Sequence, residues 1–279
     1  MSKIQRLAAV SPRGSALTTE YLRQNGISPQ LAAKYVRSGW LTRLGPGYYS
    51  LIGDEVDVLG ALRPLQDKYS GFHIAGKTAL SWFGRSLNIY KTETIHVWAD
   101  EKRIIPSWMA TAFPIVYSSS KLFTFIDPSL DSLTRPVCNT RPFGLFCSLP
   151  ERSILEILSE VGTSNADTEE VRGIFDFFIR PNVDLLGRLL AVCRSQKVIR
   201  LFAKWAEETG CVDVRALYGS YNIKCTSEAT WTLKDSVGHH IRLKPVHGDL
   251  ENASECLRSA TETPRRGRAR GFRKPGVRP

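Results

Sequence analysis

Residues 18–51 read TTEYLRQNGISPQLAAKYVRSGWLTRLGPGYYSL, and this stretch decides the fold of the N-terminal part. Its first seven residues predict a short helix that stops at Asn25-Gly26. Ser28 as N-cap and Pro29 at the first helical position predict a second helix that runs to about Ser38. Two β-type runs, at 40–44 and 48–51, flank the turn sequence Gly-Pro-Gly. Helix, tight turn, helix and hairpin is the order of a winged helix-turn-helix, which places its second helix in the DNA major groove.

The second helix has an apolar side, with Leu31 and Tyr35, and an opposite polar side that carries cations and no acid. Cations and amides on one helical face suit contacts with phosphates and base edges. The hairpin adds a cation where a wing meets the DNA backbone. The alternative interpretation is a small helical subdomain with solvated charges. The predicted DNA contacts are Thr19, Ser28, Gln30, Lys34, Arg37 and Arg43.

The positive charge is concentrated at both ends of the chain. The formal net charge is +11, of which residues 1–53 hold +6, with Glu20 as their one acid. Residues 264–279 contain seven Lys or Arg and no acid, and the remaining residues sum to −2. This distribution indicates a nucleic-acid partner rather than a generally basic surface. We expect the Gly- and Pro-containing tail to be disordered and to bind any DNA electrostatically, although a tail without a function is nearly as compatible with the sequence.

The chain of 279 residues is long enough for two domains. Its six cysteines form no CxxC pair, and neither a secretory signal nor an apolar run of 18 residues occurs. We therefore expect reduced thiols in a cytoplasmic protein. His239, His240 and His247 lie near Cys225 and Cys256 in the sequence, but their spacing does not match a metal site. No metal or other cofactor is predicted.

The rest of the chain predicts an α+β protein with a winged helix-turn-helix at 1–53, a larger mixed domain at 54–250 and a basic tail at 251–279. Apolar residues at helical spacing predict helices at 4–10, 56–69, 77–86, 148–161, 168–178, 182–193 and 196–209. Strand-like runs at 94–99, 103–105, 114–117, 122–126 and 144–147 predict a small, mainly antiparallel sheet, with two more candidate strands at 230–233 and 240–243.

Residues 71–78, GFHIAGKT, satisfy the P-loop pattern G-x-x-x-x-G-K-[ST]. In a P-loop, Lys77 would reach the β- and γ-phosphates and Thr78 would bind Mg²⁺. The context argues against this interpretation, because a helix and not a buried strand precedes the motif and its loop residues are bulky. We expect instead a helix N-terminus with Gly76 in a tight turn.

Four segments resemble a known family. SGWLTRLGPGYY at 38–49, FHIAGKTAL at 72–80, SLPERSILEIL at 148–158 and CRSQKVIRLFAKWAE at 193–207 look like the AbiEi antitoxins of bacterial type IV toxin–antitoxin systems. The resemblance covers residues 1 to about 210. It does not extend to 211–279, where the Gly- and Lys-rich ending of family members is not found.

The resemblance implies that the winged helix binds operator DNA with inverted repeats and represses its own operon. Residues 28–38 would then be the recognition helix and residues 40–51 the wing. It further implies that the C-terminal domain counters a nucleotidyltransferase-like toxin, directly or indirectly, and that the chain has no catalytic residues of its own.

Three other functions stay open at the sequence level. A stand-alone transcriptional regulator would share the winged helix and respond to a ligand. A phosphotransferase would need Lys77 and Thr78 beside a bound phosphate. A nuclease would need clustered acids, and Glu93, Asp127 and Asp131 have no convincing spacing for that.

Overall fold

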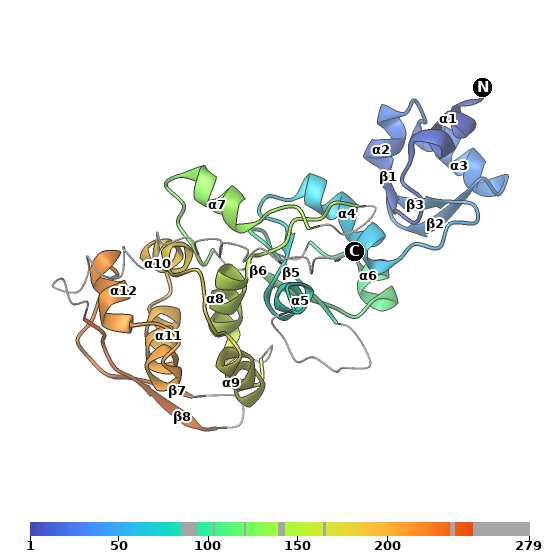
Figure 1. Cartoon of the computed structure of the whole chain (residues 1–279). Coiled ribbons are helices and arrows are strands. Elements are labelled where there is room, and N and C mark those ends of the chain that lie inside the picture. Colours follow the sequence, from blue (N-terminus) through green and yellow to red (C-terminus); the bar gives the residue numbers. More distant parts are fainter. Residues whose placement is uncertain are drawn as a thin grey trace, which may run out of the picture.

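The computed structural model describes residues 1–84, 94–102, 104–119, 121–138, 143–163, 166–234 and 238–247. The winged helix lies at one end of an elongated molecule, a central sheet follows, and a helical part with a terminal hairpin forms the other end (Figure 1). This arrangement confirms the α+β class. The predicted tail, Cys256, Glu93, Arg103 and the end of the helix predicted at 77–86 lie outside the described residues.

The N-terminal part is a winged helix with its own small core. Its helices are α1 (Lys3–Val10), α2 (Thr19–Gln24) and α3 (Pro29–Arg37). Its strands are β1 (Leu17–Thr18), β2 (Leu41–Gly45) and β3 (Tyr48–Leu51), which form an antiparallel sheet in the order β1-β3-β2. The sequence predicted the two hairpin strands, and β1 completes the sheet.

The central part contains α4 (Val58–Lys68), α5 (Gly76–Trp82), α6 (Ser107–Ala112) and α7 (Pro128–Thr134). Its sheet has the order β4-β5-β6, with β4 (His73–Ile74), β5 (Ile95–Ala99) and β6 (Ile115–Ser119). The pair β4–β5 is antiparallel, whereas β5 and β6 are parallel, and the sequence pattern did not predict β4. A parallel pair needs a crossover connection, which α6 supplies. The runs predicted as strands at 122–126 and 144–147 form only isolated bridges.

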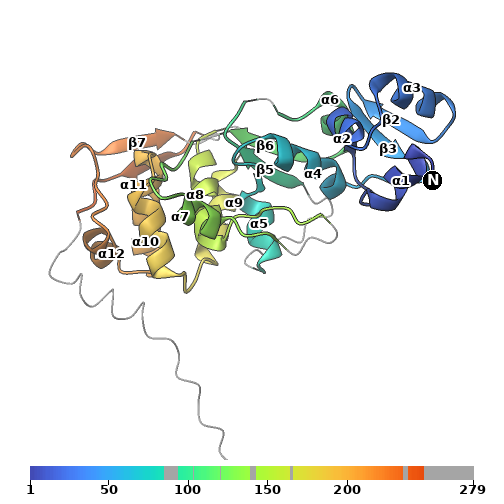
Figure 2. The ribbon, with the colours of Figure 1, turned by 90° about the horizontal axis from the view of Figure 1, so that it is seen from above.

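The C-terminal part packs helices around α8 (Pro150–Glu160), which is buried almost on every side (Figure 2). The other helices are α9 (Thr168–Asp176), α10 (Val183–Ala191), α11 (Gln196–Thr209) and α12 (Val214–Ser220). The strands β7 (Trp231–Lys234) and β8 (His240–Leu243) form an antiparallel hairpin. The sequence pattern missed α12. The helix predicted at 148–161 begins at Pro150 with Leu149 as its N-cap, and the Ser148 hydroxyl donates to Glu156.

One arginine fixes the terminal hairpin to α11. Arg200 is fully buried, and its guanidinium donates to the carbonyl oxygens of Ala229 (2.6 Å) and Ser227. The same group lies 4.3 Å from the centroid of the Trp231 ring. Carbonyl acceptors and an aromatic face together allow a buried cation without a carboxylate partner. Arg200 therefore joins the hairpin to the helical core.

Candidate nucleic-acid interface

Helix α3 is defined by local signals at both ends. The Ser28 hydroxyl accepts a hydrogen bond from the Leu31 amide at 3.3 Å, and Pro29 occupies the first turn. Gly39 ends the helix with a φ of +74°, a conformation that favours glycine. The inner face packs Ala32, which is buried, into the core of the winged helix. The opposite face of α3 therefore points to solvent.

The outward face of α3 carries Gln30, Lys34 and Arg37, all of which are exposed. Within the part of the chain that the structure describes, no carboxylate forms an ion pair with Lys34 or Arg37. Glu20, the one acid of residues 1–53, pairs with Arg23 at 2.6 Å, and a hydrogen bond from Arg23 lowers its pKa. The face is therefore cationic and available to an anionic partner.

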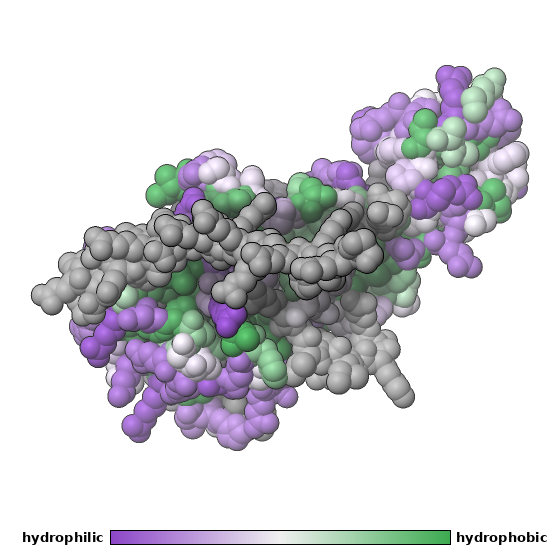
Figure 3. All heavy atoms as spheres, in the orientation of Figure 1, coloured by the Kyte–Doolittle hydropathy of each residue, from purple (hydrophilic) through white to green (hydrophobic). Residues whose placement is uncertain are grey.

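The wing adds a second exposed cation, Arg43, on β2 opposite Tyr49. No described carboxylate pairs with Arg43 either. Trp40, which precedes β2, is 49% exposed, because its side chain lies outside the core that Leu41 and Leu51 enter. In Figure 3 hydrophilic residues dominate the visible face of the winged helix.

The two remaining predicted contacts lie at helix starts. Ser28 is exposed and its hydroxyl caps α3, which places it next to the outward face. Thr19 is half-buried at the start of α2, and its hydroxyl donates to the Gly47 carbonyl oxygen at 3.3 Å. Thr19 thus joins α2 to the wing turn. Its contact with DNA stays a prediction.

The P-loop-like segment folds differently from a phosphate-binding loop. Gly76 begins α5 with a φ of +52°, and its amide donates to a carboxylate oxygen of Glu156 at 3.2 Å. A protein carboxylate therefore occupies the helix N-terminus, where a P-loop would hold phosphate. Lys77 forms an ion pair with Glu170, and the Thr78 hydroxyl accepts from the His96 amide at 2.9 Å. Both side chains are committed to contacts within the protein.

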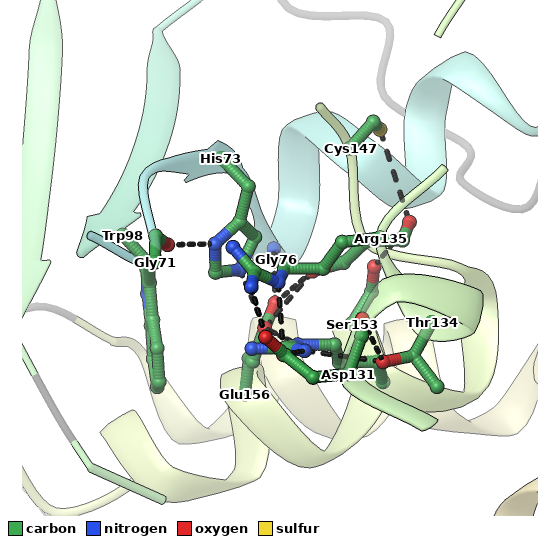
Figure 4. A network of polar contacts seen from close by, with 12 residues as sticks. Gly71, His73, Gly76, Trp98, Asp131, Thr134, Arg135, Cys147, Ser153 and Glu156 are labelled. Atoms are coloured by element: carbon green, nitrogen blue, oxygen red, sulfur yellow. Dashed lines mark hydrogen bonds and ion pairs between the residues drawn. The ribbon is translucent and has the colours of Figure 1, made fainter. Parts of the chain in front are cut away.

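Glu156 is the centre of a buried polar network that the sequence analysis did not find (Figure 4). It receives hydrogen bonds from the His73 ring (2.9 Å), the Ser148 hydroxyl (2.9 Å) and the Arg152 guanidinium (2.9 Å). Arg152 also donates to Asp131 at 2.7 Å. The network thereby joins β4, α5, α7 and α8. The i,i+4 pair Arg152–Glu156 inside an apolar helix was the sequence signal for it.

The charges of the network stabilise one another. Burial raises the pKa of Glu156, but the charges of His73 and Arg152 outweigh burial and hold that pKa at about 2. Burial lowers the pKa of His73 and so works against its protonation, but the two contacts of the ring require the protonated form. Its Nδ1 lies 2.6 Å from the Gly71 carbonyl oxygen and its Nε2 faces Glu156, and only a protonated ring can donate to both. The bonds among these groups join one strand to three helices in the interior.

Among the described residues, no group of three His, Cys, Asp or Glu side chains could hold a metal ion. In the same part of the chain, no helix has both the length and the apolarity needed to cross a membrane.

We expect Lys77→Ala to fold and to be indifferent to ATP. The variant loses the ion pair between the buried Lys77 and the partly exposed Glu170, so its melting temperature should fall while the fold persists. A nucleotide that binds only the native state stabilises it by about 2.7 kcal/mol at 100 times its Kd. Thermal denaturation with and without ATP and Mg²⁺ measures this. A rise in the melting temperature of the wild type that Lys77→Ala abolishes would contradict the assignment of this segment and support a phosphotransferase.

Residues 1–90 match the family profile described as "Transcriptional regulator, AbiEi antitoxin N-terminal domain". Residues 92–244 match the profile "Transcriptional regulator, AbiEi antitoxin, Type IV TA system", so the likeness extends beyond residue 210, where the sequence analysis ended it. No curated protein matches the chain. The crystal structure of the RV2827C protein from Mycobacterium tuberculosis aligns at 19% identity and a TM-score of 0.49, covering 78% of each chain.

Proposed function

The chain belongs to the AbiEi family of antitoxins and transcriptional regulators of type IV toxin–antitoxin systems, and from this we propose that it binds its own operator and represses its operon. The winged helix at 1–53 is the proposed DNA-binding domain, with α3 in the major groove and β2–β3 as the wing. Inverted repeats in the operator would match two copies of the winged helix.

The observation that carries this proposal is the cationic, acid-free outward face of α3. Lys34 and Arg37 lie one helical turn apart on that face, and Gln30 precedes them by another turn. Lys and Arg side chains contact phosphates, and Arg and Gln also recognise base edges in the major groove. Arg43 on the wing would contact the backbone beside the groove.

The larger domain, proposed at 54–250, would counter a nucleotidyltransferase-like toxin encoded in the same operon. Family membership supports this second activity, and no enzymatic step is needed for the proposed repression. Co-purification of both chains tests whether the domain contacts the toxin directly. Growth of cells that express the toxin alone or with this chain tests whether the chain counters the toxin at all.

The experiment that tests DNA binding compares the duplex from upstream of the gene with a random duplex of equal length. Fluorescence anisotropy at several salt concentrations gives both affinities. We expect the protein to bind the upstream duplex more tightly. For both duplexes the logarithm of the binding constant should fall linearly with the logarithm of the salt concentration, because phosphate contacts release counterions. A reporter gene behind the upstream sequence should be repressed by this protein, and one behind the random sequence should not. Equal affinity for both duplexes at every salt concentration rejects operator recognition.

A ligand-responsive regulator is the second candidate, and a cavity supports it. A space of about 720 Å³ lies between α2, the wing turn and α4, lined by Tyr21, Tyr48 and Arg63 among others. A ligand in it would touch the winged helix and the central part together. The gene beside this one separates the two functions, since the antitoxin requires a toxin gene there.

A further inference from the structure

The wing is covered by a tryptophan from the central part. Trp108, on α6, lies with its ring centroid 5.5 Å from that of Tyr48 on β3. A Cβ built on Gly45 would lie 2.4 Å from Cδ1 and 2.7 Å from Cγ of the same indole. The indole therefore rests directly on the wing backbone, where only a hydrogen atom fits. Figures 1 and 2 both place α6 beside β2 and β3.

The contact falls where the wing changes direction. The pairing of β2 with β3 shifts between Arg43 and Gly45, which leaves Leu44 as an extra residue. Such a bulge bends a strand and re-aims the side chains next to it. The indole holds the end of this bulge, two residues from the exposed Arg43. The position of Trp108 consequently sets the direction of the part of the wing that carries the cation.

Trp108 makes this contact by shape and not by a hydrogen bond. Its Nε1 is buried and has no hydrogen-bond partner among the described residues. On its other side the ring meets Phe113 at 6.4 Å between centroids, and the neighbouring Met109 is buried in the central core. Helix α6 connects β5 to β6, so the indole is held by the central sheet.

Other contacts between the two parts lie near the start of α4. The Ala16 amide donates to the Gly60 carbonyl oxygen at 3.1 Å, and Arg13 pairs with Asp54 at 2.7 Å. The cavity of about 720 Å³ separates this attachment from the wing turn. Within the winged helix Thr19 holds the wing turn at Gly47, and from the central part Trp108 supplies an aromatic contact to β3 beside the bulge.

We propose that Trp108 is a positioning residue for DNA binding: it holds the wing in the orientation in which Arg43 reaches the DNA backbone. The DNA-binding surface then depends on α6 of the central part as well as on residues 1–53. This inference rests on the proposed function. It assigns a role in DNA binding to a residue that lies outside the winged helix, on α6 of the central part.

The test is a set of double-mutant cycles on the full chain, with affinity for the upstream duplex as the readout. Trp108→Ala should weaken binding about tenfold, close to the loss from Arg43→Ala. In the Trp108→Ala background, Arg43→Ala should cost little more, because the wing has already lost its orientation. Lys34→Ala is the matched control, and its effect should persist in full in that background because α3 has its own core. Trp108→Phe should retain affinity, since it keeps a ring there and loses no hydrogen bond.

Gly45→Ala provides an independent route that does not remove the indole. The added methyl group overlaps the ring, so this variant should weaken binding in the wild type and have little effect beside Trp108→Ala. If Trp108→Ala does not fold, the cycle of Gly45→Ala with Arg43→Ala takes its place. The inference is overturned if the affinity of the Trp108→Ala/Arg43→Ala double variant falls by the product of the two single losses. It is also overturned if Trp108→Ala binds as tightly as the wild type. An equal affinity of the wild type for upstream and random duplexes overturns the proposed function instead.

Discussion

The double variant Lys34→Ala/Arg37→Ala is expected to lose affinity for the upstream duplex by about 30- to 800-fold, since each side chain would contribute ~1–2 kcal/mol. Both project from the solvent face of α3, and no described carboxylate holds either of them. Because neither contributes to the core, the melting temperature should change little. A gel shift or anisotropy titration gives the loss, and thermal denaturation provides the control for folding.

The two residues should differ in the kind of contact that they make. A phosphate contact weakens binding to every sequence and lowers the salt slope by about one, whereas a base contact costs ~1–3 kcal/mol at one base-pair position. Single variants titrated against upstream and random duplexes separate these cases. Arg6→Ala is a suitable control, because Arg6 is an exposed cation of the same domain that lies on α1. Unchanged affinity in the double variant would mean that α3 is not the recognition helix.

Glu156→Gln is expected to destabilise the fold by about 3–5 kcal/mol, because it leaves the buried His73 ring without a carboxylate and Arg152 with Asp131 alone. Glu156 is fully buried and receives hydrogen bonds from His73, Ser148, Arg152 and the Gly76 amide. At ~2–4 °C per kcal/mol the melting temperature should fall by about 10 °C. Denaturant unfolding of both proteins measures the difference, and a loss below about 1 kcal/mol would contradict the prediction.

Glu160 on the same helix is the matched control. It is also buried, but its partners are the Trp98 indole and the Ser118 hydroxyl, and burial raises its pKa. Glutamine can accept from both neutral donors and removes a charge that is costly to bury. Glu160→Gln should therefore be close to neutral in stability, although it lies one turn from Glu156. Comparison of the two variants separates the loss of the ion network from the effect of altering a buried side chain on α8.

The lowered pKa of Glu156 also predicts how stability depends on pH. The pKa of Glu156 is lowered in the folded state to about 2 from an ordinary value of 4.5. A lowered pKa contributes stability that is fully present above pH 4.5 and is lost as the pH falls toward 2. The wild type should therefore lose stability across this window, and Glu156→Gln should lose less there. A pH profile with the same slope in both proteins would show that the network does not contribute as described.

Local sequence signals determined the winged helix. The Ser28 cap, Pro29 and the glycines that end helices and turns all lie within 34 residues, so each acts on its own neighbours and no distant contact is needed. For the same reason the helices at 148–161, 182–193 and 196–209 were predicted close to their positions in the structure. The exposed face of α3 followed from helical spacing alone.

Contacts between distant residues decided the rest. Gly45 looked like a turn glycine, yet the turn is Pro46-Gly47, and Gly45 is needed because Trp108 packs on it from 63 positions further along the chain. His73 and Glu156 meet across 83 positions, which no local pattern encodes. The direction of β6 against β5 likewise depends on the path of α6. Periodicity fixes which face of an element is apolar, but only the packing of the whole chain selects the partner that this face meets.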